Sequence, residues 1–161
     1  MADKQRDDGQ HRGTELLIIN VHFSSKSGSD SLYGTNQPPR DGTLAVRIGQ
    51  ARAVREYIRG LSHDARRTIL VVGDFNTFWY EEPILLLTGG VPAMRNLALD
   101  HSPVDRVSYT FEGNSQSLDH ALVLLGEGQS ASIKTLHVNS VLPGSKQVSD
   151  HDPKYLQIKF D

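Results

Sequence analysis

The sequence contains no cysteine, and this absence excludes several kinds of chemistry. Disulfide bonds, thiolate zinc sites and thiol nucleophiles all need cysteine, so none of them is available to this chain. The composition is compatible with a reducing or an oxidising compartment, so the location of the protein stays open. At 161 residues the chain has the length of one ordinary domain, which can bury a core without disulfide or metal staples.

A long apolar segment and a strong net charge are also missing. No stretch is long and apolar enough to span a bilayer, so we expect no membrane partner. Residues 1–13 lack the apolar centre of a secretory signal and are predicted to be a disordered lead-in to one domain at residues 14–161. The 17 basic and 19 acidic residues nearly cancel, which excludes an overall basic field. A polyanion must therefore be bound locally.

The pattern of apolar residues predicts a mixture of strands and helices. Strands are expected at residues 15–23, 68–72, 107–111, 118–124, 133–138 and 155–160, and helices at 44–61 and 82–87. Residues 15–23 are apolar on both alternating faces, which predicts a core strand in the middle of a covered sheet. The turn residues 113–116 predict a hairpin between the third and fourth of these strands. Arg47 and the other arginines of the first helix are placed on its polar faces. The sequence therefore predicts an α/β layered sandwich over a single sheet.

Polar residues follow the second predicted strand. Asp74 and Asn76 lie two residues apart beyond this strand, so in an extended backbone both side chains project to one side. There the carboxylate can act as a base or metal ligand, and the amide can donate to an oxyanion. A strand-ending turn explains the tetrapeptide Gly73-Asp74-Phe75-Asn76 about as well, because these are common turn residues. This motif alone does not decide between the two.

The segment Asp150-His151-Asp152-Pro153 is harder to explain as a turn. It places an imidazole between two carboxylates just before a strand, which favours a functional site. Asp119 begins an apolar run and needs a cationic or hydrogen-bonding partner near the core. His151 can be that partner.

Two strand histidines have simpler interpretations. His120 is better explained as a packed or exposed strand residue than as a catalytic one. His22 ends the first strand, with Asn20 two residues earlier on the same face. Taken alone, His22 is best explained as a satisfied core histidine, and only the other motifs make it a candidate.

These motifs, in this order, resemble those of the endonuclease/exonuclease/phosphatase superfamily of metal-dependent phosphohydrolases, which includes DNase I. The resemblance is carried by Asn20-Val21-His22-Phe23, Gly73-Asp74-Phe75-Asn76, Ser117-Leu118-Asp119-His120 and Ser149-Asp150-His151-Asp152-Pro153. The chain is most similar to bacterial extracellular nucleases, through His22 to Lys26, Gly28-Ser29-Asp30, Gln37-Pro38-Pro39 and residues 111–116. This resemblance suggests a secreted protein. It implies the C-terminal half of a DNase I-like α/β sandwich, as one mixed sheet with helices on one face.

The resemblance also implies a role for each catalytic candidate. His151 contacts the scissile phosphate or transfers a proton, while Asp119 fixes its tautomer. Asp74 orients or deprotonates the attacking water, and Asn76 donates to a phosphate oxygen. His22 is the second histidine, placed to protonate the leaving oxygen or to stabilise its charge.

Metal and substrate contacts are implied in the same way. Asp150 is a metal ligand, and oxygen ligands without cysteine favour Mg²⁺, with Mn²⁺ or Ca²⁺ as alternatives, over zinc. Asn20 is a substrate-binding candidate. Lys26 and Arg40, in the long loop at residues 24–42, can neutralise the phosphates of a nucleic acid. For either cation singly, ordinary solvated surface charge is the simpler interpretation.

The resemblance begins only at the second half of the superfamily fold. The first half, which supplies the glutamate that is the principal metal ligand, is missing, and none of Glu15, Glu81, Glu82 and Glu112 stands in that glutamate's context. A sheet face without its partner favours association, so we expect a homodimer, a complex with a separate first half, or a fragment of a longer chain. Three functions stay open: an endonuclease acting on DNA or RNA, a phosphatase or phosphodiesterase acting on lipid or small phosphoesters, and an inactive half-domain for assembly or phosphate binding.

Overall fold

The computed structural model describes residues 14–31, 33–61, 64–111 and 113–160. The strands are β1 (Glu15–His22), β2 (Arg67–Asp74), β3 (Arg95–Asn96), β4 (Tyr109–Phe111), β5 (Asn114–Gln116), β6 (Asp119–Leu124), β7 (Gln129–Thr135) and β8 (Lys154–Phe160). The helices are α1 (Leu44–Gly60), α2 (Glu82–Thr88) and α3 (Pro103–Arg106), with the 3₁₀ turns η1 (Leu97–Asp100) and η2 (Gly144–Lys146). The predicted lead-in, residues 1–13, lies outside the described residues. Within these ranges, none of the helices has the length and hydropathy that crossing a membrane requires.

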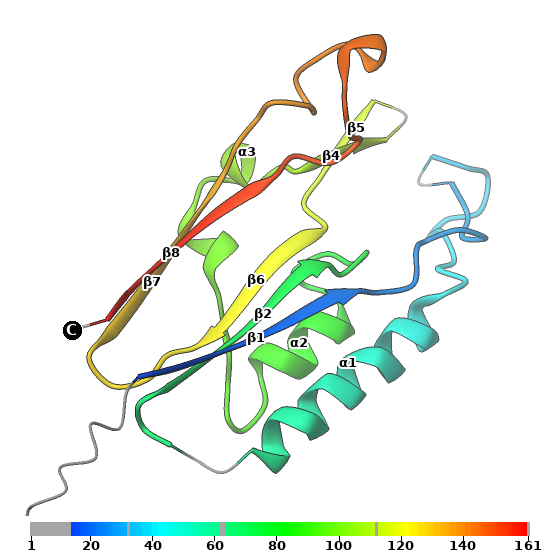
Figure 1. The fold of residues 1–161 in the computed structure, drawn as a ribbon. Coiled ribbons are helices and arrows are strands. Elements are labelled where there is room, and N and C mark those ends of the chain that lie inside the picture. The colour runs from blue at the N-terminus through cyan, green and yellow to red at the C-terminus, as the bar shows by residue number, and fades with distance from the viewer. Residues whose placement is uncertain (1–13, 32, 62–63, 112, 161) are drawn as a thin grey trace, which may run out of the picture.

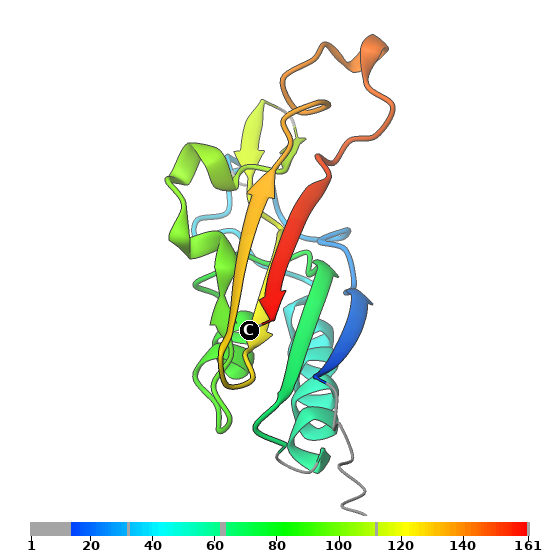
Figure 2. The ribbon, with the colours of Figure 1, turned by 60° about the vertical axis from the view of Figure 1, so that its left-hand side comes forward.

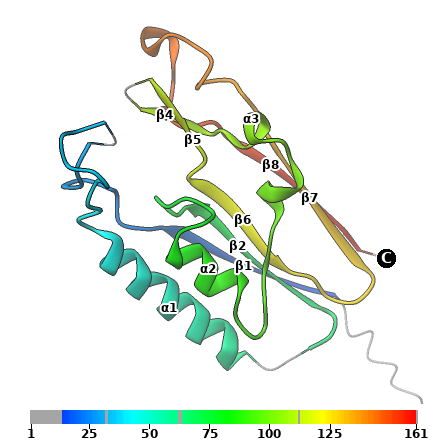
Figure 3. The same cartoon turned by 180° about the vertical axis from the view of Figure 1, so that it is seen from behind.

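A four-stranded mixed sheet in the order β1-β2-β6-β3 forms the centre of the fold (Figure 1). β1 and β2 are parallel and are joined through α1, whereas β6 runs antiparallel to β2 and β3. Helices α1 and α2 cover one face of this sheet, and the antiparallel ribbon β7–β8 covers part of the other (Figures 1 and 3). The predicted fold class is confirmed. The expectation of a single sheet is corrected, because β7 and β8 pair only with each other among the described strands.

The two faces of β2 explain why the layers form. Ile69 and Val71 point toward the helices and pack in one cluster with Ile58 of α1. Leu70 points the other way and packs with Ile133 of β7. Because successive side chains of a strand alternate between faces, a strand covered on both faces must be apolar throughout. The run at residues 68–72 has this pattern, which is why the sequence alone predicts it.

The predicted hairpin between residues 107–111 and 118–124 is wrong. β4 turns back on β5 instead, and Gln116, expected in the turn, pairs with Tyr109. β6 follows this hairpin in sequence and pairs with β2 and β3 instead. The residues of β6 are mostly buried on both faces, and an apolar strand of this kind is stable only inside a covered sheet.

β1 is an edge strand among the described strands, so the predicted position of residues 15–23 in the middle of a covered sheet is wrong. The ribbon leaves β1 open on the face that it covers for β2 and β6 (Figure 2). Ile18 is the register partner of Leu70, so the two side chains point to the same face. Leu70 is 1% exposed, whereas Ile18 is 55% exposed and Leu16, two residues earlier, is 38% exposed. Leu16 and Ile18 together form the open strip, an apolar surface that continues the core out to solvent.

The long loop after β1 is held on α1 by a buried arginine. Arg47 is fully buried, so its predicted place on a polar helix face is wrong. Its guanidinium pairs with Asp41 and donates hydrogen bonds to the hydroxyl of Thr43 at 2.7 Å and the carbonyl of Ser24 at 3.3 Å. A buried cation is tolerated only with such partners. The interactions therefore fix both ends of the loop.

Candidate active site

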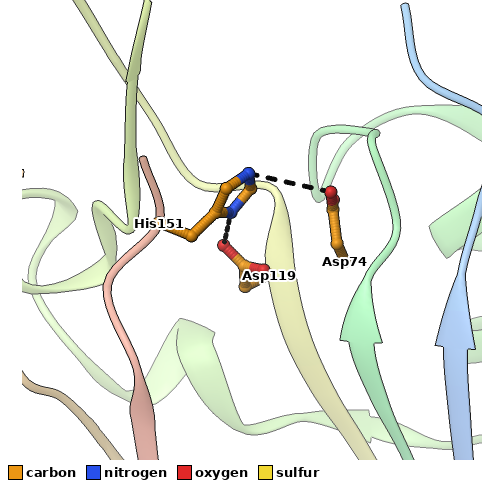
Figure 4. Close-up of side chains that lie close together, drawn as sticks. All are labelled: Asp74, Asp119 and His151. Carbon is orange, nitrogen blue, oxygen red and sulfur yellow. Dashed lines mark hydrogen bonds and ion pairs between the residues drawn. The ribbon is translucent and has the colours of Figure 1, made fainter. Parts of the chain in front are cut away.

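Three chain segments bring Asp74, Asp119 and His151 together (Figure 4). Asp74 ends β2 and Asp119 begins β6, and the two residues are register partners. His151, just before β8, lies with its imidazole between them. Nδ1 of His151 is 2.8 Å from Oδ2 of Asp119, and Nε2 is 3.8 Å from Oδ2 of Asp74. These three residues are called the Asp–His cluster below.

The contact with Asp119 sets the chemistry of His151. A carboxylate only accepts, so Nδ1–H of His151 donates to Asp119 and Nε2 faces Asp74. This hydrogen bond raises the pKa of His151, although partial burial acts in the opposite direction. Asp119 also accepts a hydrogen bond from the hydroxyl of Ser108 at 2.5 Å. The predicted partnership of Asp119 and His151 is thus confirmed as a contact, while its catalytic role stays a prediction.

Asp74 is held by a tight turn. The backbone N–H of Asn76 donates to Oδ1 of Asp74 at 2.7 Å, and the side-chain amide donates to Oδ2 at 3.0 Å. Asn76 has a φ of 48°, so the extended backbone that the sequence suggested is wrong, and this left-handed residue brings the two side chains together. The same amide donates to the carbonyl of Phe23 at 3.0 Å. Asn76 orients Asp74 here, and its donation to a phosphate oxygen stays a prediction.

Burial raises the pKa of Asp74, and the hydrogen bond from the Asn76 backbone opposes this increase. The negative charge of Asp119 raises the pKa of Asp74 further. A carboxylate with a raised pKa binds a proton more readily, which improves it as a base toward an attacking water.

Gly73 allows β1 and β2 to approach closely beside the cluster. Its φ is 135°, and a Cβ at this position would lie 1.9 Å from the carbonyl oxygen of Val21. Only glycine fits there. The close approach places His22 opposite Asp74 in the strand register, with Nε2 3.6 Å from Oδ2.

His22 is not a core histidine, because its side chain is 77% exposed. The 3.6 Å contact with Asp74 is longer than a hydrogen bond but allows electrostatic attraction when His22 is protonated. Asn20 is exposed on the same face of β1. His22 therefore lies next to the Asp–His cluster, and Asn20 lies between His22 and the open strip along β1.

The donor set of the Asp–His cluster fits a divalent cation. Its three residues each offer one ligand atom within 4.8 Å of the others, and two of these atoms are carboxylate oxygens. Mg²⁺ and Ca²⁺ prefer oxygen and take about six or more ligands, so further ligands must come from outside this group. Asp150, the predicted ligand, is exposed and lies outside the group. Its role as a ligand stays a prediction.

Three of the four glutamates considered in the sequence form ion pairs away from the Asp–His cluster. Glu15 pairs with Arg67, Glu82 with Arg52 and Glu81 with Lys26. Glu112 lies outside the described residues. None of the three paired glutamates joins the Asp–His cluster, which agrees with the sequence-based decision to assign no glutamate as the metal ligand.

The two cations predicted to bind substrate differ in their surroundings. Nζ of Lys26 lies 3.1 Å from Oδ2 of Asp41 and 3.0 Å from Oε1 of Glu81. Two carboxylates therefore compensate its charge, which weakens its attraction for a phosphate. Arg40 is exposed, and its backbone N–H donates to Asp30. The substrate contacts of Lys26 and Arg40 stay predictions.

His120 is a packed strand histidine, which is one of the two structural alternatives that the sequence left open. Its ring is 2% exposed, Nε2 lies 3.0 Å from the carbonyl of Thr77, and Nδ1 lies 3.2 Å from Nδ2 of Asn96. A carbonyl only accepts and an amide nitrogen only donates, so the neutral tautomer with hydrogen on Nε2 satisfies both contacts. Burial lowers the pKa of His120 to about 4.

His120 makes the fold sensitive to mild acid. Its pKa falls from 6.5 in the unfolded chain to about 4 in the folded one, so below pH 6.5 the unfolded state binds the extra proton. We expect this site to remove about 3 kcal/mol from the free energy of unfolding between pH 7 and pH 4. Urea unfolding of the wild type and of His120→Gln across this range measures the difference. A variant that loses stability as steeply as the wild type would contradict the assignment.

The loop that carries His151 is fixed by Asp152. The side chain of Asp152 is fully buried, and its Oδ1 accepts hydrogen bonds from the backbone N–H groups of Val138, Asn139 and Ser140 at 3.1, 2.7 and 2.9 Å. Asn139 in turn donates its side-chain amide to the carbonyl of His151 at 2.7 Å. From the sequence, Asp152 is recognised only as a second carboxylate beside His151. Asn139 is not recognised, because no local pattern indicates a contact between two loops.

Solved structures match nearly the whole chain. The chain is similar to D. rerio TDP2 complexed with single strand DNA product, with 16% identity, a TM-score of 0.57, and coverage of 92% of this chain and 58% of that one. The chain is also similar to the mannosyl-6-phosphatase Bt3783 of Bacteroides thetaiotaomicron, with 18% identity, a TM-score of 0.59, and coverage of 92% of this chain and 53% of that one. An endonuclease/exonuclease/phosphatase family protein of the same bacterium matches with 17% identity, a TM-score of 0.58, and coverage of 92% of this chain and 52% of that one. Neither protein-family models nor curated proteins give a match.

The chain therefore has the fold of endonuclease/exonuclease/phosphatase proteins, as the motifs predicted. It spans about half the length of the solved chains that it matches. The low identities establish the fold alone, and the greater similarity to bacterial extracellular nucleases stays a prediction.

Proposed function

We propose that this chain supplies the proton-transfer part of a divalent-metal-dependent phosphodiesterase that cleaves DNA or RNA internally. The observation that carries the proposal is the His151 imidazole, bonded to Asp119 through Nδ1 at 2.8 Å while Nε2 faces Asp74 at 3.8 Å. Phosphodiester hydrolysis needs a group that accepts a proton from water and groups that stabilise a more negative transition state. Asp74 and His151 meet these two needs.

Each residue of the cluster has a distinct part in this proposal. Asp74, with its raised pKa, accepts the proton of the attacking water. His151, held by Asp119, directs Nε2–H at a non-bridging phosphate oxygen. His22, exposed beside Asp74, donates a proton to the leaving oxygen. A bound divalent cation would be held by Asp150, the predicted ligand, and would polarise a phosphoryl oxygen.

Two observations support different substrates. The match with TDP2 in complex with single strand DNA product, together with the nuclease-like segments His22 to Lys26 and Gln37-Pro38-Pro39, favours nucleic acid. The match with a mannosyl-6-phosphatase favours a small phosphoester, which is the second candidate. An inactive half-domain for assembly or phosphate binding is the third, supported by the absence of a glutamate from the described cluster.

A substrate panel separates these functions. Purified protein is incubated with plasmid DNA, RNA and bis-(p-nitrophenyl) phosphate in Mg²⁺, Mn²⁺ or EDTA. We expect plasmid nicking that EDTA abolishes, because the transition-state charge then loses its cation. Cleavage of the small ester alone would support the second candidate. No cleavage of any substrate in either metal would contradict both hydrolytic functions.

The open strip supports a further part of the proposal, which is that two copies of this chain pair through it. Leu16 and Ile18 are exposed on the same face of β1 as Asn20 and His22, so a sheet that covers the strip also reaches the candidate site. The matched chains are about twice as long as the aligned region, which leaves room in their fold for a second layer. A two-fold dimer buries the same strip from each copy.

Light scattering during size-exclusion chromatography tests this pairing. We expect the wild type to have twice the mass of the chain, and Ile18→Lys to shift it to a monomer, because a buried unpaired ammonium costs several kcal/mol. The matched control is Val46→Lys on α1, which is similarly exposed but on the helical side, and it stays a dimer. A compact wild-type monomer would rule out the homodimer.

A further inference from the structure

Two adjacent residues contact the Asp119–His151 pair: Ser108 contacts Asp119, and Tyr109 contacts His151. The hydroxyl of Ser108 donates to Oδ2 of Asp119 at 2.5 Å. The ring of Tyr109 stacks on the imidazole of His151, with centroids 4.5 Å apart and planes inclined by 29°. Neither residue belongs to a motif that sequence reasoning singled out.

Ser108 is fixed by its surroundings. It is fully buried, its backbone N–H donates to the carbonyl of Gln116 at 3.0 Å, and its carbonyl accepts from the N–H of Asp152 at 2.7 Å. These bonds tie the start of the β4–β5 hairpin to the segment that carries His151. The Ser108 hydroxyl therefore has a defined position from which it occupies Asp119 Oδ2, the same oxygen that accepts Nδ1–H of His151.

Tyr109 is fixed in the same way. Its backbone forms an isolated antiparallel bridge with His151, so the two residues are neighbours in main chain as well as side chain. The Tyr109 ring also stacks with Phe111, at a centroid distance of 6.2 Å and an inclination of 8°. The imidazole is thus restrained by a hydrogen bond at its edge and by an aromatic ring on its face. Rotation of the imidazole would lose both contacts.

We propose that Ser108 and Tyr109 are positioning residues, which hold the carboxylate of Asp119 and the imidazole plane of His151 so that Nε2 faces Asp74. This inference rests on the proposed hydrolytic function for its catalytic consequence. The geometric part stands without it, because the contacts restrain His151 whether or not a substrate is present.

The kinetic test uses Ser108→Ala and Tyr109→Leu in the protein as purified, with plasmid DNA and bis-(p-nitrophenyl) phosphate. We expect kcat to fall about tenfold or more in each, as is usual for groups that orient a reacting side chain, with KM changed less than about twofold. Tyr109→Phe keeps the ring and retains wild-type kcat. The matched controls Ser115→Ala, on the paired strand, and Tyr57→Leu, exposed on α1, retain kcat. Unchanged kcat in Ser108→Ala and Tyr109→Leu would overturn the proposal.

A second measurement does not depend on activity. In NMR spectra of the wild type, we expect the Tyr109 ring current to shift the ring protons of His151 upfield and the hydrogen bond to Asp119 to protect Nδ1–H. We expect Tyr109→Leu to remove the upfield displacement and Ser108→Ala to remove the protection of Nδ1–H, while urea unfolding shows both variants folded. If the wild type cleaves no substrate, the proposed function is wrong, and these spectra alone test whether Ser108 and Tyr109 position His151. Unchanged His151 resonances in both variants would overturn it.

Discussion

Replacing His151 by alanine is expected to lower kcat for phosphodiester cleavage by about a thousandfold, with KM little changed. The reason is that removing one donor that stabilises the transition-state charge lowers kcat by roughly 10² to 10³, and His151 directs Nε2–H at a non-bridging phosphate oxygen. Its Nδ1 contact with Asp119, at 2.8 Å, places it for this role. The measurement is steady-state hydrolysis of bis-(p-nitrophenyl) phosphate in saturating Mg²⁺.

The matched control for this substitution is His101→Ala. His101 is a half-buried histidine that follows η1 and lies outside the Asp–His cluster. We expect this variant to keep the wild-type kcat. Equal activity of the wild type and His151→Ala would remove His151 from the mechanism.

Replacing Asp152 by alanine is expected to lower the free energy of unfolding by about 3 kcal/mol or more. Its carboxylate accepts five hydrogen bonds, three from backbone N–H groups and two from the side chains of His137 and Ser140. Removing it leaves these donors without their acceptor in a buried place, and each such donor costs about 1–3 kcal/mol. Urea unfolding measures the loss, and kcat should fall with it, since the backbone of His151 is bonded to the same loop.

The acid dependence of Asp152 separates its contribution from that of His120. Burial opposes ionisation of Asp152, but hydrogen bonds from Ser140, Asn139 and His137 outweigh it and lower the pKa to about 2. The folded pKa lies below the unfolded value of 3.8, so the stability from this group is present above pH 3.8 and is lost as the pH falls toward 2. Asp152→Asn, which keeps one acceptor oxygen, should lose less stability than Asp152→Ala. Equal losses would show that the accepted hydrogen bonds matter little.

The features that the sequence could predict are those encoded in local runs. Residues 68–72 are a short β-branched run that stops at Gly73, which indicated a buried strand, and Asp74 follows where this strand ends. Asp119 begins an apolar run, and a carboxylate near the core needs a hydrogen-bonding or cationic partner. The order of the motifs indicated His151 as that partner. The predicted helix at residues 44–61 matches α1 for the same reason, since its apolar spacing repeats over many residues.

The features that the sequence could not predict depend on contacts between distant segments. Asn114-Ser115-Gln116 has the composition of a turn, but pairing with β4 makes it a strand. Arg47 is charged, which favours a polar helix face, but its guanidinium pairs with Asp41 and is buried. The contact of Ser108 with Asp119 joins the residue before β4 to the first residue of β6, and no local sequence pattern indicates it.

The neutral role of His120 was predictable in part. An imidazole inside an apolar strand is more often a satisfied core residue than a catalytic one, and the structure agrees. Its partners, Thr77 after β2 and Asn96 in β3, are distant from it in sequence and could not be named from sequence. The position of His22 was less predictable, because its exposure follows from the uncovered face of β1 rather than from β1 itself.

A double-mutant cycle between Asp119 and His151 tests the central claim most directly. The measured quantity is kcat for bis-(p-nitrophenyl) phosphate in the wild type, Asp119→Asn, His151→Ala and the double variant. If Asp119 acts by holding His151, the double variant is no slower than His151→Ala alone, because residues that act as a unit are strongly non-additive. If the fall in kcat of the double variant equals the product of the falls in the two single variants, the two residues act independently, and this result would contradict the account.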